Sequence, residues 1–208
     1  KTKITSGGSA ANTIHGLAKL GIDTGFIGKV GRDELGSLFK EDLTRANITP
    51  FLLESDTDSG IAIALVSPDS ERTFATYLGA AVELSAYDIT KDLFKGYDYF
   101  HIEGYLVQNH ELIETAVRLA KESGLKVSLD LAAYNVVEAN LGFLQGIIKN
   151  YVDIVFANEE EAKAFTGEKP EDALNTIAEM CELAIVKVGK EGSLIKRGNE
   201  TAQVGIIK

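Results

Sequence analysis

Apolar residues recur at helical spacing in two segments near the start of the chain, on either side of a β-prone run. Residues 10–20 have one apolar face and stop at Gly21, a typical helix end. Residues 24–30 have the composition of a strand, and Asp33 is expected to cap a second helix with an apolar stripe ending at Leu43. A helix, a strand and a helix with short joints indicate the start of an α/β layer.

The middle of the chain breaks this rhythm with short β-prone runs. Residues 60–67 and 73–78 flank the turn-forming residues 68–71, which predicts an antiparallel hairpin too small to bury its own core. With the run at 51–53, we interpret residues 48–79 as contributing a β lid to the main domain. An edge hairpin without a role is the alternative.

From Tyr97 onward, strands and helices alternate. Alternation of this kind predicts a parallel sheet with right-handed crossovers, covered by helices, and hence the α/β class. Two short strands close the chain, at 193–196 and 201–206. The expected parallel strands are residues 97–102, 126–130, 152–157 and 183–188, and the expected helices are residues 109–123, 136–150, 159–165 and 170–181.

Composition narrows the class of protein. The 208 residues carry a net charge of −10, which argues against nucleic acid and anionic membranes as partners. The single Cys181 excludes an internal disulfide and suits a reducing compartment, and the three histidines show no zinc spacing. With no apolar run of membrane-spanning length, we expect a cytoplasmic soluble protein of one domain over residues 1–208.

Polar residues stand at the ends of four predicted parallel strands, where ligands bind in open α/β sheets. Glu103 ends the first strand, Asp130 the second, Asn158 the third and Lys187 the fourth. Each has a structural alternative: Asp130 as a helix cap, Asn158 and Glu161 as a capping box, and Lys187 as a solvated side chain. Gly189 and Gly192 fit a nucleotide site or merely a hairpin turn. The coincidence of four such ends favours a ligand site.

The stretch from Ser6 to Asn12 has the form of a ligand loop at a helix start. Gly7 and Gly8 allow a sharp turn and a close approach, and Ser9 is expected to cap the helix that begins at Ala10. An ordinary loop with an N-cap is the alternative.

Asn158 and Glu161 suit magnesium and phosphate chemistry, because hard cations prefer carboxylate oxygens and retain waters. Lys187 would offset phosphate charge, and phosphoryl transfer requires mainly positioning and charge stabilisation. The sequence lacks the glycine-lysine-serine/threonine phosphate loop and the dinucleotide fingerprint.

At these residues the chain resembles the ribokinase-like (PfkB) carbohydrate and nucleoside kinases. Gly7 to Asn12 with Gly28 to Asp33 is similar to their first signature, and Asn158 to Glu161 matches their Asn-x-x-Glu motif. Within the family, the adenosine kinases are most similar to this chain in three places: the Gly-Gly-Ser-x-x-Asn form, residues 71–80 and residues 102–105. The resemblance implies a three-layer sandwich with a central, mainly parallel sheet and a small β lid.

The same resemblance implies ATP- and Mg²⁺-dependent phosphorylation of the primary hydroxyl of a nucleoside or sugar, and a homodimer through the lid is conceivable. By this likeness, Gly7, Gly8, Ser9, Asn12 and Glu103 bind the acceptor. The likeness also implies a phosphate contact for Arg72. The nucleotide side is assigned to Asn158, Lys187, Gly189 and Gly192, and the metal to Glu161 and Asp130.

Two family elements are not in this sequence. The opening strand would precede Lys1, and the glycine-rich motif with the catalytic aspartate would follow Lys208. We therefore expect no general base in this chain, and no turnover by it alone. A sugar kinase, an inactive binding module of the same fold, and another α/β enzyme with Asn158 and Glu161 as mere caps remain alternatives.

Overall fold

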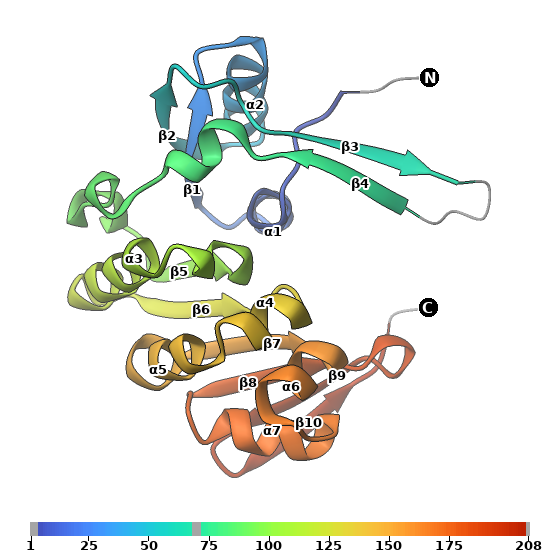
Figure 1. Ribbon diagram of the computed structural model, residues 1–208. Coiled ribbons are helices and arrows are strands. Elements are labelled where there is room, and N and C mark those ends of the chain that lie inside the picture. Colours follow the sequence, from blue (N-terminus) through green and yellow to red (C-terminus); the bar gives the residue numbers. More distant parts are fainter. Residues whose placement is uncertain (1–3, 68–71, 207–208) are drawn as a thin grey trace. The chain divides into compact units, whose positions relative to one another are not determined.

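The computed structural model describes residues 4–67 and 72–206, except for the side chain of Arg72. The chain divides into two compact units, residues 1–88 and residues 89–208, which are described separately below (Figure 1). Within the described residues, no helix is both long and apolar enough to cross a membrane.

Unit 1 begins with the predicted helix–strand–helix order and adds a second strand. β1 and β2 are parallel and in register from Thr24 opposite Ile48 to Gly31 opposite Ser55. The elements are α1 (Ser9–Lys19), β1 (Thr24–Gly31), α2 (Glu34–Arg45) and β2 (Ile48–Ser55).

The expected capping role of Ser9 is wrong. The helix begins at Ser9 itself, and its N-cap is Gly8, which has no side chain to offer and no side-chain capping bond. Gly8 adopts φ of 110°, a conformation that favours glycine, so the glycine that makes the turn also takes the cap position. The amide of Asn12 donates to the carbonyl of Gly8 at 2.9 Å and closes the first turn.

Asp33 caps α2, as predicted, and also holds the segment that leads into the hairpin. One carboxylate oxygen accepts from the amide of Gly36 and the hydroxyl of Ser59, and the other accepts from the amide of Ser59, all at 2.7 Å. The amide of Gly31 donates to the Ser59 hydroxyl oxygen at 2.9 Å. The three bonds to the carboxylate lower the pKa of Asp33, the Ser59 amide being the largest cause.

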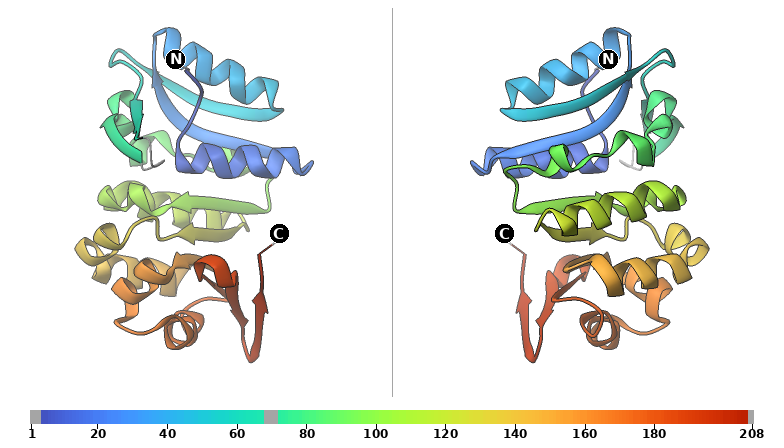
Figure 2. Two further views of the ribbon diagram at one scale, coloured as in Figure 1. Left: turned by 90° about the vertical axis from the view of Figure 1, so that its right-hand side faces the viewer. Right: turned by 90° about the vertical axis from the view of Figure 1, so that its left-hand side faces the viewer.

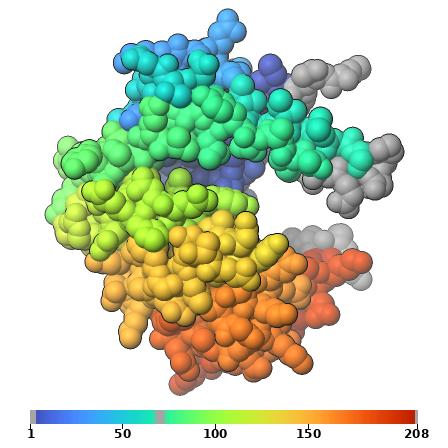
Figure 3. Space-filling model, in the orientation of Figure 1, coloured from blue at the N-terminus to red at the C-terminus, as the bar shows by residue number. Residues whose placement is uncertain are grey.

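The predicted hairpin is present as β3 (Ile61–Val66) and β4 (Arg72–Tyr77), which pair antiparallel. The predicted turn at 68–71 lies outside the described residues. Every β3 residue is exposed, and the hairpin stands apart from the rest of unit 1 (Figure 3). At its base the backbone is tight: a Cβ on Gly79, whose φ is +54°, would lie 2.2 Å from the carbonyl oxygen of Asp58. Three short 3₁₀ turns follow, at Gly79–Glu83, Ala86–Asp88 and Lys91–Phe94.

Unit 2 contains a six-stranded sheet in the order β10-β9-β8-β7-β6-β5. β5 to β8 are parallel and β9 and β10 antiparallel, which confirms the mainly parallel α/β sheet. The strands are β5 (Tyr99–Glu103), β6 (Lys126–Asp130), β7 (Ile154–Asn158), β8 (Leu183–Lys187), β9 (Ser193–Arg197) and β10 (Glu200–Val204). The helices are α3 (His110–Glu122), α4 (Tyr134–Ala139), α5 (Leu141–Tyr151), α6 (Glu159–Thr166) and α7 (Pro170–Ala178).

The two faces of this sheet differ in burial. Because the parallel strands follow one another in a single direction, right-handed crossovers put their helices on the same face (Figure 2). On that face Leu129, Val155 and Ala184 are completely buried in one row across the sheet. The opposite face carries Glu103, Asp130 and Lys187, so the predicted strand-end residues lie away from the helix layer.

The single helix expected over residues 136–150 is wrong, because the structure has two helices separated at Asn140. Asn140 leaves the helical region at φ of −127° and ψ of 20°. Its side-chain amide donates to the carbonyl of Val136 at 2.9 Å. Asparagine competes with the helix for backbone partners in this way, and apolar periodicity does not reveal that competition.

Replacement of Asp33 by alanine tests the network at the base of the hairpin. Asp33→Ala leaves the amides of Gly36 and Ser59 without their acceptor, and we expect the free energy of unfolding to fall by about 2 kcal/mol. Since the pKa of Asp33 is lowered, its contribution is present above the ordinary value of 3.8 and is lost as the pH falls below it.

Urea unfolding at pH 7 and at pH 3 to 4 measures both effects. Glu34→Ala, on the exposed neighbouring residue, is the matched control. Equal stabilities of the two variants at pH 7 would contradict the role given to Asp33.

Candidate functional site

Four polar residues meet at the carboxyl edge of the unit 2 sheet. Glu103 at the end of β5 is the register partner of Asp130 at the end of β6. Asn158 at the end of β7 is likewise the partner of Lys187 at the end of β8. Strand ends that are far apart in the sequence therefore gather at one edge of the sheet as two neighbouring register pairs, as the alternating pattern predicts.

Asn158 and Glu161 form a complete capping box at the start of α6. The Glu161 carboxylate accepts from the amide and the side-chain nitrogen of Asn158, both at 2.7 Å, and Asn158 Oδ1 accepts from the Glu161 amide at 2.9 Å. The predicted capping box is thus present. It does not account for burial, because Glu161 is only 2% exposed and an exposed glutamate would cap equally well.

The electrostatic surroundings of Glu161 disfavour its charge. Burial raises the pKa of this carboxyl, against the opposing effect of the Asn158 amide. The carboxylates of Asp130 and Glu103 raise the pKa further, while the Lys187 ammonium lowers it. Three acids and one lysine therefore influence one another at this edge of the sheet.

Asp130 is held from two sides and caps no helix, so that alternative is wrong. One carboxylate oxygen accepts from Lys187 Nζ at 2.8 Å and the other from the amide of Ala132 at 2.9 Å. The N-cap of the following helix is Ala133. Ala132 has φ of +67°, which is unfavourable for a residue with a Cβ, so the turn that orients Asp130 is locally strained.

Glu103 is 8% exposed and lies beside two polar residues that the sequence interpretation missed. His101 Nε2 lies 3.4 Å from Glu103 Oε1, and His101 Nδ1 lies 2.9 Å from Ser128 Oγ. Polar residues at alternate positions of two neighbouring apolar strands are the signal that would have found them. Gly104 follows Glu103 where a Cβ would lie 2.6 Å from the carbonyl oxygen of Leu131.

Gly189 and Gly192 belong to the connection between β8 and β9. Both have positive φ, 53° and 93°, and the amide of Val188 donates to the carbonyl of Gly192 at 2.8 Å. A Cβ on Gly192 would lie only 1.9 Å from the carbonyl oxygen of Val204. The turn itself thus requires these glycines, and a nucleotide contact remains a prediction.

The acceptor residues predicted in unit 1 are exposed and lie around the start of α1. Gly7, Gly8 and Asn12 are exposed, and no atom lies within 4 Å of a Cβ placed on either glycine. Arg72 begins β4, and its side chain lies outside the described part of the chain.

The donor set at the unit 2 edge fits Mg²⁺ held through water. Carboxylate and amide oxygens are the ligands that Mg²⁺ prefers, and the three acids exceed the single lysine in charge. In residues 4–67 and 72–206 no three histidine, cysteine, aspartate or glutamate residues are arranged to enclose a metal directly. A hydrated cation is consistent with both observations.

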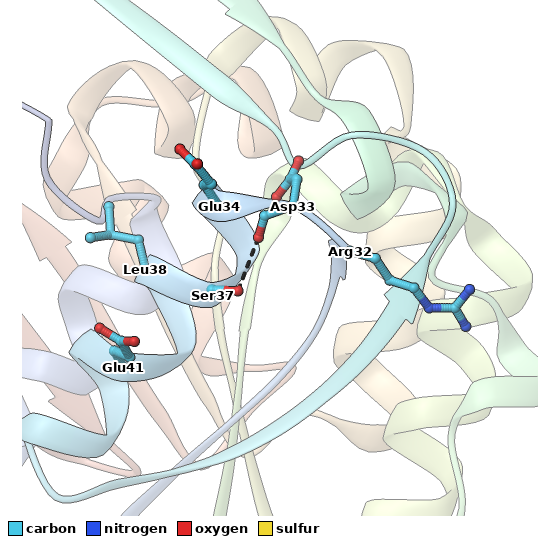
Figure 4. Close-up of a pocket in the computed structure, with 6 residues that line it drawn as sticks. All are labelled: Arg32, Asp33, Glu34, Ser37, Leu38 and Glu41. Carbon is cyan, nitrogen blue, oxygen red and sulfur yellow. Dashed lines mark hydrogen bonds between the residues drawn. The ribbon is translucent and has the colours of Figure 1, made fainter.

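Two concave surfaces lie away from these residues. One of about 510 Å³ is beside the start of α2, where the Ser37 hydroxyl donates to the carbonyl of Asp33 at 3.1 Å (Figure 4). Another of about 670 Å³ is lined in part by Cys181, and burial raises the pKa of that thiol to about 11, which makes it unreactive. Neither surface includes a predicted site residue.

Known proteins match nearly the whole chain. The model of the pfkB family carbohydrate kinases matches residues 1–208. An uncharacterized sugar kinase of Archaeoglobus fulgidus is 30% identical over 91% of this chain and 76% of its own length.

Solved structures give the same result. An adenosine kinase of Sinorhizobium meliloti superposes with a TM-score of 0.89 at 33% identity, covering 98% of this chain and 65% of that protein. A probable sugar kinase of Rhizobium etli gives 0.90 at 32% identity, covering 97% and 63%. The chain thus spans somewhat less than two thirds of the length of these two proteins. With the family model matched from residue 1 to residue 208, the chain belongs to the pfkB family of carbohydrate kinases.

Proposed function

We propose that the protein transfers the γ-phosphoryl group of ATP to a primary hydroxyl of a nucleoside, adenosine-like, or of a sugar. The observation that carries this proposal is the buried Glu161 carboxylate, held by Asn158 and surrounded by further acids at the sheet edge. A buried carboxylate costs stability, so its retention in the first turn of α6, beside the sheet edge, points to function.

In this proposal the unit 2 edge binds the nucleotide and its cation. Asn158, Lys187 and the turn at Gly189 and Gly192 contact the nucleotide, while Glu161 and Asp130 hold the hydrated Mg²⁺. When bound, Mg²⁺ supplies charge neutralisation for the phosphates. Lys187, paired with Asp130 at 2.8 Å, is restrained where its charge can also face phosphate oxygens.

We propose acceptor contacts for Gly7, Gly8, Ser9 and Asn12 in unit 1 and, separately, for Glu103 in unit 2. A carboxylate accepts hydrogen bonds from sugar hydroxyls, and the exposed loop before α1 offers amide and hydroxyl groups. Arg72 is proposed to contact phosphate. We assign no general base among the described residues.

A nucleoside is the favoured acceptor. The Sinorhizobium adenosine kinase is 33% identical to this chain, and the sequence form of the acceptor loop is of the adenosine kinase type. A sugar such as fructose or ribose is the alternative, since the similar Archaeoglobus and Rhizobium proteins are described as sugar kinases.

An acceptor panel tests the proposal. We expect the protein expressed from its complete open reading frame to consume ATP with Mg²⁺ when adenosine is supplied, at a rate at least about ten times that with ribose or fructose. A coupled ADP assay with guanosine and inosine included measures this. Stimulation by a sugar alone would reassign the acceptor. If no compound stimulates ATP consumption but the protein still binds a nucleoside, the protein would be a binding module and not a kinase.

Glu161→Gln separates the catalytic from the capping role of Glu161. Because glutamine also serves in capping boxes, we expect the unfolding free energy at pH 7 to stay within about 1 kcal/mol of wild type. The Mg²⁺ concentration for half-maximal rate should rise about ten-fold or more.

The pH dependence gives a second readout. The raised pKa means that wild-type stability attributable to this group is largest below the ordinary value of 4.5 and falls as the pH rises through the raised pKa. That fall should be absent in Glu161→Gln. Glu160→Gln, on the exposed neighbouring residue, is the control, and an unchanged Mg²⁺ dependence in Glu161→Gln would show that Glu161 is only a cap.

A further inference from the structure

His101 lies among side chains of three adjacent strands on the sheet face opposite the helices. On its own strand β5, Glu103 is two residues further and therefore on the same face, with 3.4 Å between His101 Nε2 and Glu103 Oε1. On β6, Ser128 is its register partner, and its hydroxyl oxygen lies 2.9 Å from His101 Nδ1. On β7, the ring of Phe156 packs edge-to-face at 6.3 Å between centroids.

These contacts fix the orientation of the imidazole. A carboxylate only accepts hydrogen bonds, so a hydrogen bond at this contact requires the ring proton on Nε2. In the neutral ring Nδ1 is then an acceptor, and the Ser128 hydroxyl is the donor that satisfies it. Phe156 packs against the ring from the third side, while these two polar contacts set the orientation of its nitrogens.

Burying these three polar side chains costs folding stability. The side chains of His101 and Glu103 are 15% and 10% exposed, and Ser128 is 7% exposed. Positions of the same face on β7 and β8, such as Phe156 and Ile185, are apolar, so the sheet does not need polar residues there. Buried polar groups that are fully hydrogen-bonded restrict a site to one geometry, which is what a binding carboxylate requires.

We propose that His101 is a positioning residue, oriented by Ser128, that holds the Glu103 carboxylate in the rotamer that receives a hydroxyl of the acceptor. This inference rests on the proposed function, in which Glu103 contacts the acceptor. His101 itself does not touch the substrate and takes no part in the transfer. Its effect is on acceptor affinity, and the nucleotide side of the site is not affected.

Two substitutions of similar size distinguish the roles of the two ring nitrogens. His101→Gln places an amide nitrogen near the position of Nε2, while His101→Asn places one near Nδ1 and leaves Glu103 without this donor. With the protein expressed from its complete open reading frame, we expect His101→Asn and His101→Leu to raise the acceptor KM about ten-fold, and the ATP KM to change less than about two-fold. His101→Gln should stay within about three-fold of wild type.

Phe156→Leu is the control for packing, because it removes the ring contact and leaves the polar chain intact. We expect it to lower the thermal midpoint without changing the acceptor KM. Equal acceptor KM values for His101→Gln and His101→Asn, or a lowered midpoint with unchanged KM in every His101 variant, would overturn the inference.

The tautomer supplies a readout that needs no activity. Long-range ¹H–¹⁵N spectra of the imidazole should show His101 protonated at Nε2, and Glu103→Gln should change that signal. A ring protonated at Nδ1 would overturn the inference. A wild-type protein with no acceptor-dependent ATP consumption would instead contradict the proposed function, and the spectra would then decide alone whether His101 and Glu103 interact.

Discussion

The parallel register of β5 to β8 is the constraint on which the candidate site depends. It fixes Glu103 beside Asp130 and Asn158 beside Lys187, although these residues are separated by long stretches of chain. Side-chain direction alternates along a strand, so a slip of one residue would turn each of them toward the helix layer. The completely buried row of Leu129, Val155 and Ala184 on the helix side opposes such a slip, and the apolar core thereby holds the polar edge in place.

The electrostatics of this edge are unfavourable in the isolated fold. Asp130 and Glu103 both raise the pKa of Glu161, and the Lys187 ammonium opposes them. Lys187 is already engaged by Asp130. A bound cation would reverse this balance, and so would protonation of Glu161. Repulsion among these acids lowers the stability of the free protein, and a bound cation would relieve it. Such a cost is typical of sites selected for binding.

Local sequence patterns predicted most helices and strands, and the polar residues at the edge of the unit 2 sheet. Apolar periodicity and the strand-end rule can both be read from short stretches of sequence. These patterns failed where a single side chain or backbone angle determines where a helix begins or ends. Gly8 took the cap position expected for Ser9 because its φ is positive, and Asn140 divided a helix that apolar spacing had joined. The contact of His101 with Ser128 depends on the register of β5 against β6, which neither strand encodes alone. The burial of Glu161 likewise comes from tertiary packing, whereas its capping box was legible in the sequence.

The base of the β3–β4 hairpin has a consequence for local stability. Asp33, Ser59 and Gly31 join the segment before β3 to α2 and β1, while β3 itself is exposed along its length. The hairpin therefore contributes little buried apolar area and can open as a separate cooperative unit. The polar network at its base would confine that opening to the hairpin. Hydrogen exchange in the two regions would then differ by orders of magnitude within a few residues of Ser59, with the boundary set by one carboxylate.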